Sequence, residues 1–119
     1  ESSRIDILLE KSSGEKCFVE IKNVHLKRAK SAEFPDSVTT RGAKHLRELS
    51  NMVKLGHRAV MVYLVQREDC ATFKIAKDID PSYHDAFVKA TNSGVEHLCY
   101  SCRLTTKSIC IDKRIRMIL

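Results

Sequence analysis

Two acidic residues and a lysine near the N-terminus have the types and the spacing of a site that hydrolyses phosphodiesters. Asp6 lies in the apolar run 5–9, and Glu20 and Lys22 lie in the run 17–22. Both runs are rich in large and β-branched apolar residues, and the polar segment 11–15 between them has turn composition. The two runs therefore predict a β-hairpin that carries all three side chains.

The length of the turn predicts the register of this hairpin. Residues 5, 7 and 9 are expected opposite residues 21, 19 and 17, which makes one face of the hairpin apolar. On the other face Asp6 is expected opposite Glu20, with Cβ atoms about 5 Å apart, where two like charges destabilise a sheet. A proton, a nearby cation such as Lys22, or a divalent metal held by both carboxylates must offset this repulsion.

Metal-dependent phosphodiester cleavage needs this arrangement of an Asp on one strand and Glu-x-Lys on the next. The carboxylates hold Mg²⁺ or Mn²⁺, the metal activates water and offsets charge on the phosphate, and the lysine orients the nucleophile or stabilises the transition state. We therefore predict Asp6, Glu20 and Lys22 as catalytic residues, with both carboxylates as metal ligands. The alternative is a surface hairpin with an ordinary mixed-charge face, and the spacing alone does not decide between the two.

A helix that would lie near this hairpin is predicted over 40–55. Leu46, Leu49 and Val53 form an apolar stripe at helical spacing. Thr39 or Thr40 is suited to cap the start of the helix, and a glycine follows at position 56, where helices commonly end. The same helix also carries the basic residues Arg41, Lys44, Arg47 and Lys54.

The rest of the chain alternates between strand and helix patterns. The segment 59–65 is an unbroken apolar run, which is typical of a strand buried on both faces. A second helix is predicted over 81–92, with Pro81 in its first turn and Gly94 after its end. Strands are predicted over 95–104 and 108–111, and the polar segments 23–36 and 66–80 are interpreted as loops. This order predicts an α/β (α+β) fold with a mixed β-sheet flanked by helices.

Composition limits the class of protein and its partners. The chain has 119 residues, 43% of them hydrophobic and 30% charged, as expected for one globular domain. Its net charge of +6 and pI near 9.2 favour a polyanionic partner. No apolar run is long enough to span a membrane, no signal peptide is recognisable, and the five cysteines predict reduced thiols and a cytoplasmic location. Because Glu1 is not a natural start, we expect a fragment whose upstream part is missing.

Several longer stretches carry a likeness to a known family. The most specific is the run 34–42, Phe34-Pro35-Asp36-Ser37-Val38-Thr39-Thr40-Arg41-Gly42. It is supported by Ser3-Arg4-Ile5-Asp6, Val19-Glu20-Ile21-Lys22, Lys44-His45-Leu46, Gly56-His57-Arg58-Ala59-Val60 and Ile79-Asp80-Pro81-Ser82-Tyr83. Over essentially its whole length the chain resembles the C-terminal half of the sugar fermentation stimulation protein family.

The resemblance implies that residues 1–119 form a domain like the PD-(D/E)XK nucleases, which in the family follows an N-terminal OB-like barrel that is absent here. It also implies DNA binding and a regulatory role in sugar, notably maltose, metabolism. Carried over onto this sequence, the nuclease-type acidic positions fall on Asp6 and Glu20, and the lysine falls on Lys22. Asp36 lies after the Glu-x-Lys strand, so it is expected either as an additional metal ligand or as a residue that shapes its loop.

We expect the domain to bind DNA without sequence preference, because the chain contains no recognisable base-reading motif. Phosphate contacts would make the affinity fall steeply with salt. Hydroxyl and N–H donors at the start of the helix 40–55 would add to the basic side chains, and His45 would orient the site or bind phosphate. The residues expected to contact DNA are Lys27, Arg28, Thr39, Thr40, Arg41, Lys44, His45 and Arg47; for the basic ones the alternative is a solvated surface.

Three functions remain open at this point. The first is a regulatory DNA-binding domain with a nuclease-like site that takes Mg²⁺ or Mn²⁺, whether or not catalysis survives. The second is an active Mg²⁺-dependent DNA endonuclease or exonuclease. The third is a metabolic protein that binds a sugar phosphate, which competition between sugar phosphates and DNA would discriminate. A homodimer is an open alternative for the assembly of the chain.

Overall fold

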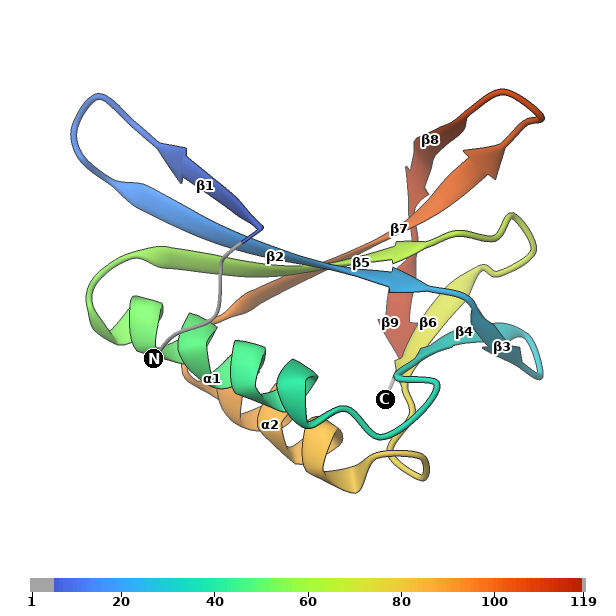
Figure 1. The fold of residues 1–119 in the computed structure, drawn as a ribbon, viewed down its shortest axis with the longest axis horizontal. Coiled ribbons are helices and arrows are strands. Elements are labelled where there is room, and N and C mark those ends of the chain that lie inside the picture. The colour runs from blue at the N-terminus through green and yellow to red at the C-terminus, as the bar shows by residue number, and fades with distance from the viewer. Residues whose placement is uncertain (1–5, 119) are drawn as a thin grey trace.

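Nine strands and two helices alternate along residues 6–118, the part of the chain that this computed structural model describes (Figure 1). Their bounds are β1 (Ile7–Glu10), β2 (Lys16–Val24), β3 (Leu26–Arg28), β4 (Ser31–Phe34), α1 (Thr40–Lys54), β5 (Arg58–Val65), β6 (Thr72–Ile75), α2 (Pro81–Asn92), β7 (Glu96–Leu104), β8 (Ile109–Arg114) and β9 (Arg116–Ile118).

The larger sheet is mixed, as predicted. Its five strands have the order β1-β2-β5-β7-β8, with parallel pairs in the centre and an antiparallel pair at each edge. The predicted hairpin register is confirmed where the strands pair, because Ile7 lies opposite Val19 and Leu9 opposite Cys17. Asp6 comes directly before β1, and Ile5 lies outside the described residues.

A second, four-stranded sheet replaces much of what was predicted as loop. Its order is β3-β4-β6-β9, so the segments 23–36 and 66–80 contain strands and the loop predictions are wrong there. The final strand β9 also lies beyond the last strand predicted. These strands have only three or four residues, and half of their side chains are polar because one face of the sheet is open to solvent. A pattern that short does not stand out from a polar loop.

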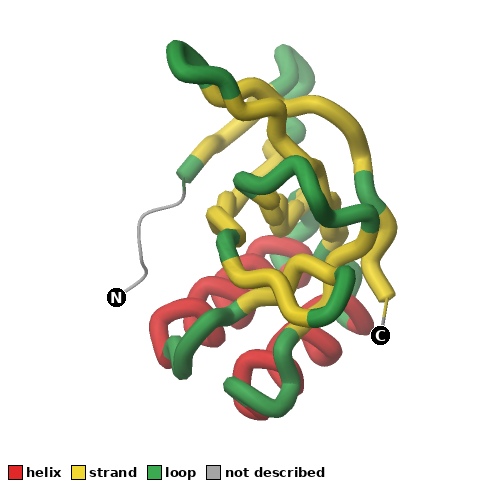
Figure 2. Tube along the Cα trace, turned by 90° about the vertical axis from the view of Figure 1, so that its right-hand side faces the viewer, coloured by secondary structure: helices red, strands yellow, loops and turns green. Residues whose placement is uncertain are grey.

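Both helices are confirmed, and local capping explains their starts. The hydroxyl of Thr39 accepts a hydrogen bond of 2.9 Å from the backbone N–H of Gly42, which makes Thr39 the N-cap of α1. Asp80 caps α2 in the same way through the backbone N–H of Tyr83 at 3.0 Å, and Pro81 occupies the first turn. The helices lie side by side on one face of the larger sheet (Figures 1 and 2). No helix within residues 6–118 has the length and apolar character needed to span a membrane.

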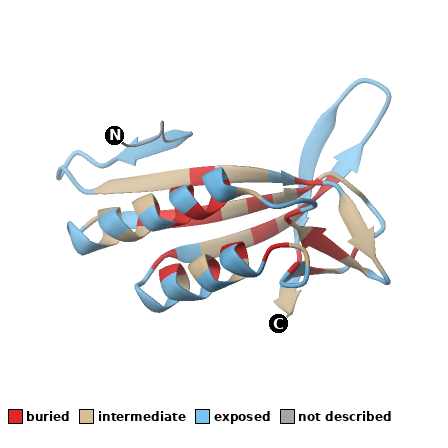
Figure 3. Cartoon of the chain, turned by 60° about the horizontal axis from the view of Figure 1, so that its bottom comes forward, coloured by how far each residue is buried: buried red, intermediate tan, exposed pale blue. Residues whose placement is uncertain are grey.

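The core lies between the helices and β5, as the burial colours show (Figure 3). Leu46 and Leu49 of α1 pack there with Tyr63 of β5 and Tyr83 of α2, and each is at most 1% exposed. Burying a side chain of this size stabilises the fold by about 1.5–3 kcal/mol. The hydroxyls of Tyr63 and Tyr83 satisfy each other at 2.6 Å, so this dry core leaves neither without a partner.

The opposite face of the larger sheet lies away from both helices (Figure 1). Strand alternation places Ile7 and Leu9 of β1 on this face, together with Ile21 of β2 and Val62 of β5. Ile7 is 41% exposed and Leu9 56% exposed, and Ile21 and Val62 are half-buried. We call this surface the open face. The prediction that the strand 59–65 is buried on both faces therefore holds fully only for its helix side.

Candidate functional site

Glu20 and Lys22 point toward the helices because they alternate along β2 with residues of the open face. Their Cα partners on the neighbouring strand β5 are Met61 and Tyr63, both fully buried in the core. The described pairing of β2 with β1 ends before it reaches Glu20. Both polar side chains therefore lie where β2 has left its short edge partner, under the first turns of α1.

Asp6 joins this pair from the other strand of the hairpin. Its Oδ2 atom accepts a hydrogen bond of 2.9 Å from the backbone N–H of Ile21, the residue after Glu20. The Nζ atom of Lys22 lies 3.4 Å from Oε2 of Glu20. The structure therefore brings together the three side chains predicted as catalytic.

His45 of α1 completes the cluster. Its Nδ1 atom lies 2.8 Å from Nζ of Lys22 and 3.0 Å from Oε2 of Glu20. The side chains of His45, Glu20 and Lys22 are 5%, 4% and 16% exposed, so the cluster is nearly dry. We call Glu20, Lys22 and His45 the buried triad.

Burial and neighbouring charges shift the pKa values of Glu20 and His45 in opposite directions. Burial raises the pKa of Glu20, nearby Asp6 raises it further, and Lys22 opposes both. Burial lowers the pKa of His45, and the positive charges of Lys22 and Arg41 act in the same direction. The lowered pKa of His45 favours a neutral imidazole, whose Nδ1 is suited to accept a hydrogen bond from Nζ of Lys22 while the same Nζ atom contacts Glu20.

Two buried polar atoms of the triad have no hydrogen-bond partner among residues 6–118. They are Oε1 of Glu20 and Nε2 of His45. Buried polar atoms are nearly always satisfied by protein, water or a bound ion. An open carboxylate oxygen beside a second carboxylate, that of Asp6, is the donor set that a hard divalent cation prefers.

The described residues do not form a complete metal cage. Within residues 6–118 no three His, Cys, Asp or Glu side chains are arranged so that they hold a metal ion. Asp36 is exposed on the loop between β4 and α1, so the predicted set of Asp6, Glu20 and Asp36 is not preassembled. Glu20 and Asp6 are thus the residues that would hold a cation, with water completing its shell.

A basic surface runs along α1, the helix that also carries His45. Arg41, Lys44 and Arg47, all predicted to contact DNA, are exposed, and none forms an ion pair within residues 6–118. Lys44 and Arg47 line a groove of about 860 Å³ between the two helices, together with Lys54 and Lys89. We call these five basic residues the helical basic surface. Glu48 and Asp85 also line the groove, so its charge is mixed but predominantly positive.

The other predicted DNA contacts, apart from Thr40, have partners within the protein. Lys27 pairs with Asp69 at 3.1 Å, and Arg28 pairs with Glu33 and Asp78, each at 2.6 Å. Thr39 uses its hydroxyl as the cap of α1 and donates its backbone N–H to Asp80 at 2.8 Å. Thr40 is exposed at the first position of α1, whereas His45 is buried against Glu20. Of the predicted DNA-contacting residues, Arg41, Lys44, Arg47 and Thr40 are therefore exposed on α1.

Sequence reasoning missed the contacts of two residues. His45 was placed at the site without its contacts to Glu20 and Lys22, although it shares the inward stripe of α1 with Leu46 and Leu49. Asp80 was not singled out, yet it is buried and links the starts of both helices through Thr39 and Tyr83. The Asp-Pro pair at the start of the second helix was the available signal.

Comparison with known proteins gives a consistent relationship. The family model described as "Sugar fermentation stimulation protein RE domain" matches residues 1–108. The sugar fermentation stimulation protein homolog of Paramagnetospirillum magneticum is 61% identical over 108 residues, which cover 91% of this chain and 46% of that protein. The homolog of Rhodospirillum centenum is 57% identical over 117 residues, covering 98% of this chain and 50% of that protein. The chain thus spans about half the length of the curated relatives it matches.

A solved structure agrees with the fold. SfsA of Pyrococcus furiosus, solved in complex with Ca²⁺, superposes on this chain with a TM-score of 0.90 at 28% sequence identity. The match covers all of this chain and 52% of the archaeal protein. The arrangement of two sheets and two helices is therefore shared with an experimental structure.

Proposed function

Because the chain belongs to the sugar fermentation stimulation protein family, we propose that it is a DNA-binding domain with a divalent-metal site at Glu20 and Asp6. The observation that carries the proposal is the buried triad with its open carboxylate oxygen, on whose His45 the positive charge of Arg41 acts. Binding would be led by phosphate contacts and would carry no sequence preference. Its place in the cell would be in the regulation of sugar metabolism, notably that of maltose.

The residues at the site suit a hard cation. The archaeal relative was solved with Ca²⁺, and Mg²⁺ or Mn²⁺ would be held here by the same kind of oxygen ligands. Oε1 of Glu20 is a buried acceptor without a partner in the described residues, and Asp6 supplies a second carboxylate nearby. A divalent metal bound there supplies an activated water and offsets negative charge on a phosphate.

The chain's own residues would prepare that chemistry. Nζ of Lys22 lies 3.4 Å from Glu20, where it is suited to orient a nucleophile or to bind a phosphate oxygen. His45 holds Lys22 in place, because Nδ1 of a neutral imidazole accepts a hydrogen bond from Nζ of Lys22 at 2.8 Å. Arg41, Lys44 and Arg47 would hold the DNA backbone along α1, one helical turn after another.

The same site supports an active Mg²⁺-dependent nuclease as the second candidate function. The observation that favours it is that the hairpin brings Asp6, Glu20 and Lys22 together while one oxygen of Glu20 stays without a partner in the described residues. A purely structural pair would satisfy both oxygens of the buried Glu20, whereas here one oxygen is left open. The two candidate functions therefore differ only in whether the metal-loaded site cleaves a bound phosphodiester.

One experiment with the full-length protein separates the two functions. Wild type, Glu20→Gln and the control Glu10→Gln would be incubated with supercoiled and single-stranded DNA in Mg²⁺ or Mn²⁺. Glu10 is exposed at the end of β1 and lies outside the site. Cleavage by wild type and the control but not by Glu20→Gln is the nuclease result. Salt-dependent binding without cleavage by all three is the DNA-binder result, and an affinity that does not change with salt contradicts both.

A further inference from the structure

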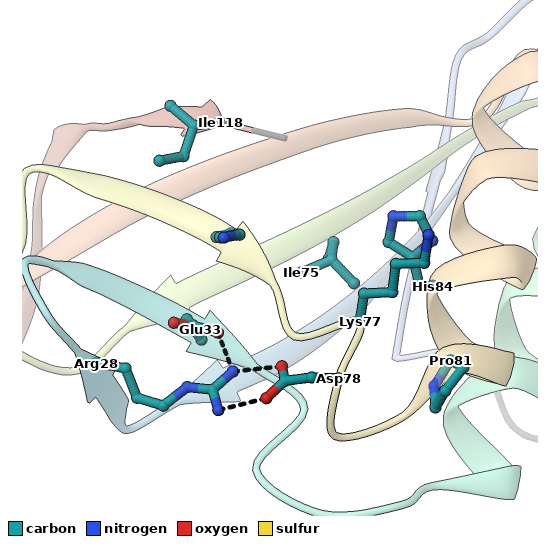
Figure 4. Close-up of a pocket in the computed structure, with 9 residues that line it drawn as sticks. Arg28, Glu33, Ile75, Lys77, Asp78, Pro81, His84 and Ile118 are labelled. Atoms are coloured by element: carbon teal, nitrogen blue, oxygen red, sulfur yellow. Dashed lines mark hydrogen bonds and ion pairs between the residues drawn. The ribbon is translucent and has the colours of Figure 1, made fainter.

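A separate cleft of about 710 Å³ lies between the smaller sheet and the start of α2 (Figure 4). A volume of this size suits a small-molecule ligand. The residues that line it include charged side chains from β3, β4 and β6 and from the turn before α2. None of them belongs to the buried triad or to the helical basic surface, so the cleft is distinct from the site described above.

The register of the smaller sheet explains why its cleft side is charged. Glu33 of β4 lies beside Lys74 of β6, which lies beside Ile118 of β9, so these side chains share one face. The alternating residues, Phe73 among them, face the other way, and Phe73 is buried in the core. The charges of the cleft are therefore mounted on a sheet that the core holds in place.

One wall of the cleft is fixed by Arg28. Its guanidinium makes two hydrogen bonds to the carboxylate of Asp78, at 2.8 and 2.6 Å, and one of 2.6 Å to Glu33 (Figure 4). These contacts tie β3 to the turn that precedes α2. They hold the pKa of Asp78 at about 2, so this carboxylate stays ionised and able to accept further hydrogen bonds.

The remaining polar groups of the cleft lack partners in the described part of the chain. Lys74 and Lys77 are exposed and form no ion pair with any carboxylate of residues 6–118. Nδ1 of His84 is buried, has no hydrogen-bond partner there, and lies 3.8 Å from the nearest carboxylate oxygen, that of Asp85. The cleft thus presents two free ammonium groups and an imidazole opposite an ionised carboxylate.

We propose that this cleft binds a small phosphate monoester that carries hydroxyl groups. Lys74, Lys77 and His84 would take the phosphate, because ammonium groups and an imidazole N–H donate charge-assisted hydrogen bonds to its oxygens. The carboxylate of Asp78 would accept hydrogen bonds from the hydroxyls, and Ile118, on the same face of the sheet as Lys74, would lie along the carbon skeleton. The proposal does not depend on metal binding or DNA cleavage at Glu20.

Titration of the full-length protein with glycerol 3-phosphate tests the proposal. Inorganic phosphate and glycerol serve as separate ligands, and binding is followed by calorimetry and by NMR shifts. We expect glycerol 3-phosphate to bind more tightly than phosphate, and glycerol not to bind. Lys77→Ala should weaken binding roughly tenfold, the size of one lost charge-assisted hydrogen bond. Lys107→Ala removes an exposed lysine on the β7–β8 turn and should change nothing.

Three results would overturn the proposal. The first is the absence of binding to wild type at millimolar glycerol 3-phosphate. The second is equal weakening by Lys77→Ala and Lys107→Ala, which would show diffuse charge attraction. The third is competition between glycerol 3-phosphate and DNA that persists in Lys77→Ala, which would place the ligand on the helical basic surface instead.

Discussion

Replacing Lys22 with methionine tests the electrostatics of the buried triad. The substitution keeps most of the side-chain volume and removes the ammonium that Glu20 and His45 share. It leaves Glu20, whose side chain is 4% exposed, as a carboxylate without its cation. Removing one partner of a buried ion pair typically costs about 3–5 kcal/mol.

The expected loss of stability is smaller here, because Glu20 can bind a proton and become neutral. Protonating a carboxyl group of ordinary pKa 4.5 costs about 3 kcal/mol at pH 7 and less than about 1 kcal/mol at pH 5. Since Lys22 is itself 16% exposed and Glu20 already has a raised pKa, we expect Lys22→Met to lose about 2–3 kcal/mol at pH 7. At pH 5 the loss should fall below about 1 kcal/mol.

The sign of this pH dependence follows from proton linkage. In the variant the pKa of Glu20 in the folded state rises further above its unfolded value, so the folded state binds a proton more readily. The carboxyl group then favours the fold at low pH, and this contribution is lost as the pH rises through the folded pKa. The gap in stability between wild type and variant should therefore widen from pH 5 to pH 7.

Urea unfolding followed by circular dichroism at pH 5, 6 and 7 measures this gap directly. Lys44→Met is the matched control, because Lys44 is an exposed lysine on α1 without an ion pair in the described residues. It should change stability by less than about 0.5 kcal/mol at every pH. A loss in Lys22→Met that is the same at pH 5 and pH 7 would refute the reasoning, since it would show lost packing instead of an uncompensated charge.

Three further predictions follow from other contacts. Arg47→Ala should weaken DNA binding and reduce the slope of log affinity against log salt by about 1. Lys27→Ala is the control and should leave that slope unchanged, because Lys27 is already paired with Asp69. Equal slopes in the two variants would count against DNA binding by the helical basic surface. Tyr83→Phe should cost about 1–3 kcal/mol in thermal unfolding because the buried hydroxyl of Tyr63 loses its partner, and the double replacement by phenylalanine should cost less than this single one. Gly42→Ala would place a Cβ atom 2.9 Å from the N-cap side chain of α1, so a loss of about 1–3 kcal/mol is expected, and an unchanged melting temperature would contradict it.

The long elements were predictable from sequence because their patterns are strong. The apolar stripe of Leu46 and Leu49 gave α1, and the Asp-Pro start with its following glycine matched α2 closely. The hairpin register followed from the short turn and the apolar alternation. The smaller sheet was missed because its strands have only three or four residues, and because β4, β6 and β9 pair with partners about 40 residues apart in the chain.

The site was predictable in part for a similar reason. Asp6, Glu20 and Lys22 sit on one hairpin, so local pairing was enough to bring them together. His45 comes from α1, and its contact with Lys22 depends on how the helix packs over the sheet, which no local pattern encodes. Arg28 was expected to contact DNA, but its partner Asp78 lies 50 residues away in the chain and becomes visible only once both sheets are formed.

Ile21 of β2 links the open face of the larger sheet to the carboxylates on its helix side. Its side chain belongs to the open face, while its backbone N–H holds the carboxylate of Asp6 next to Glu20. A partner that packed against the open face would contact Ile21, and any shift of its backbone would move Asp6 relative to Glu20. Contact on the apolar side of the sheet would in this way change the spacing of the two carboxylates on the other side.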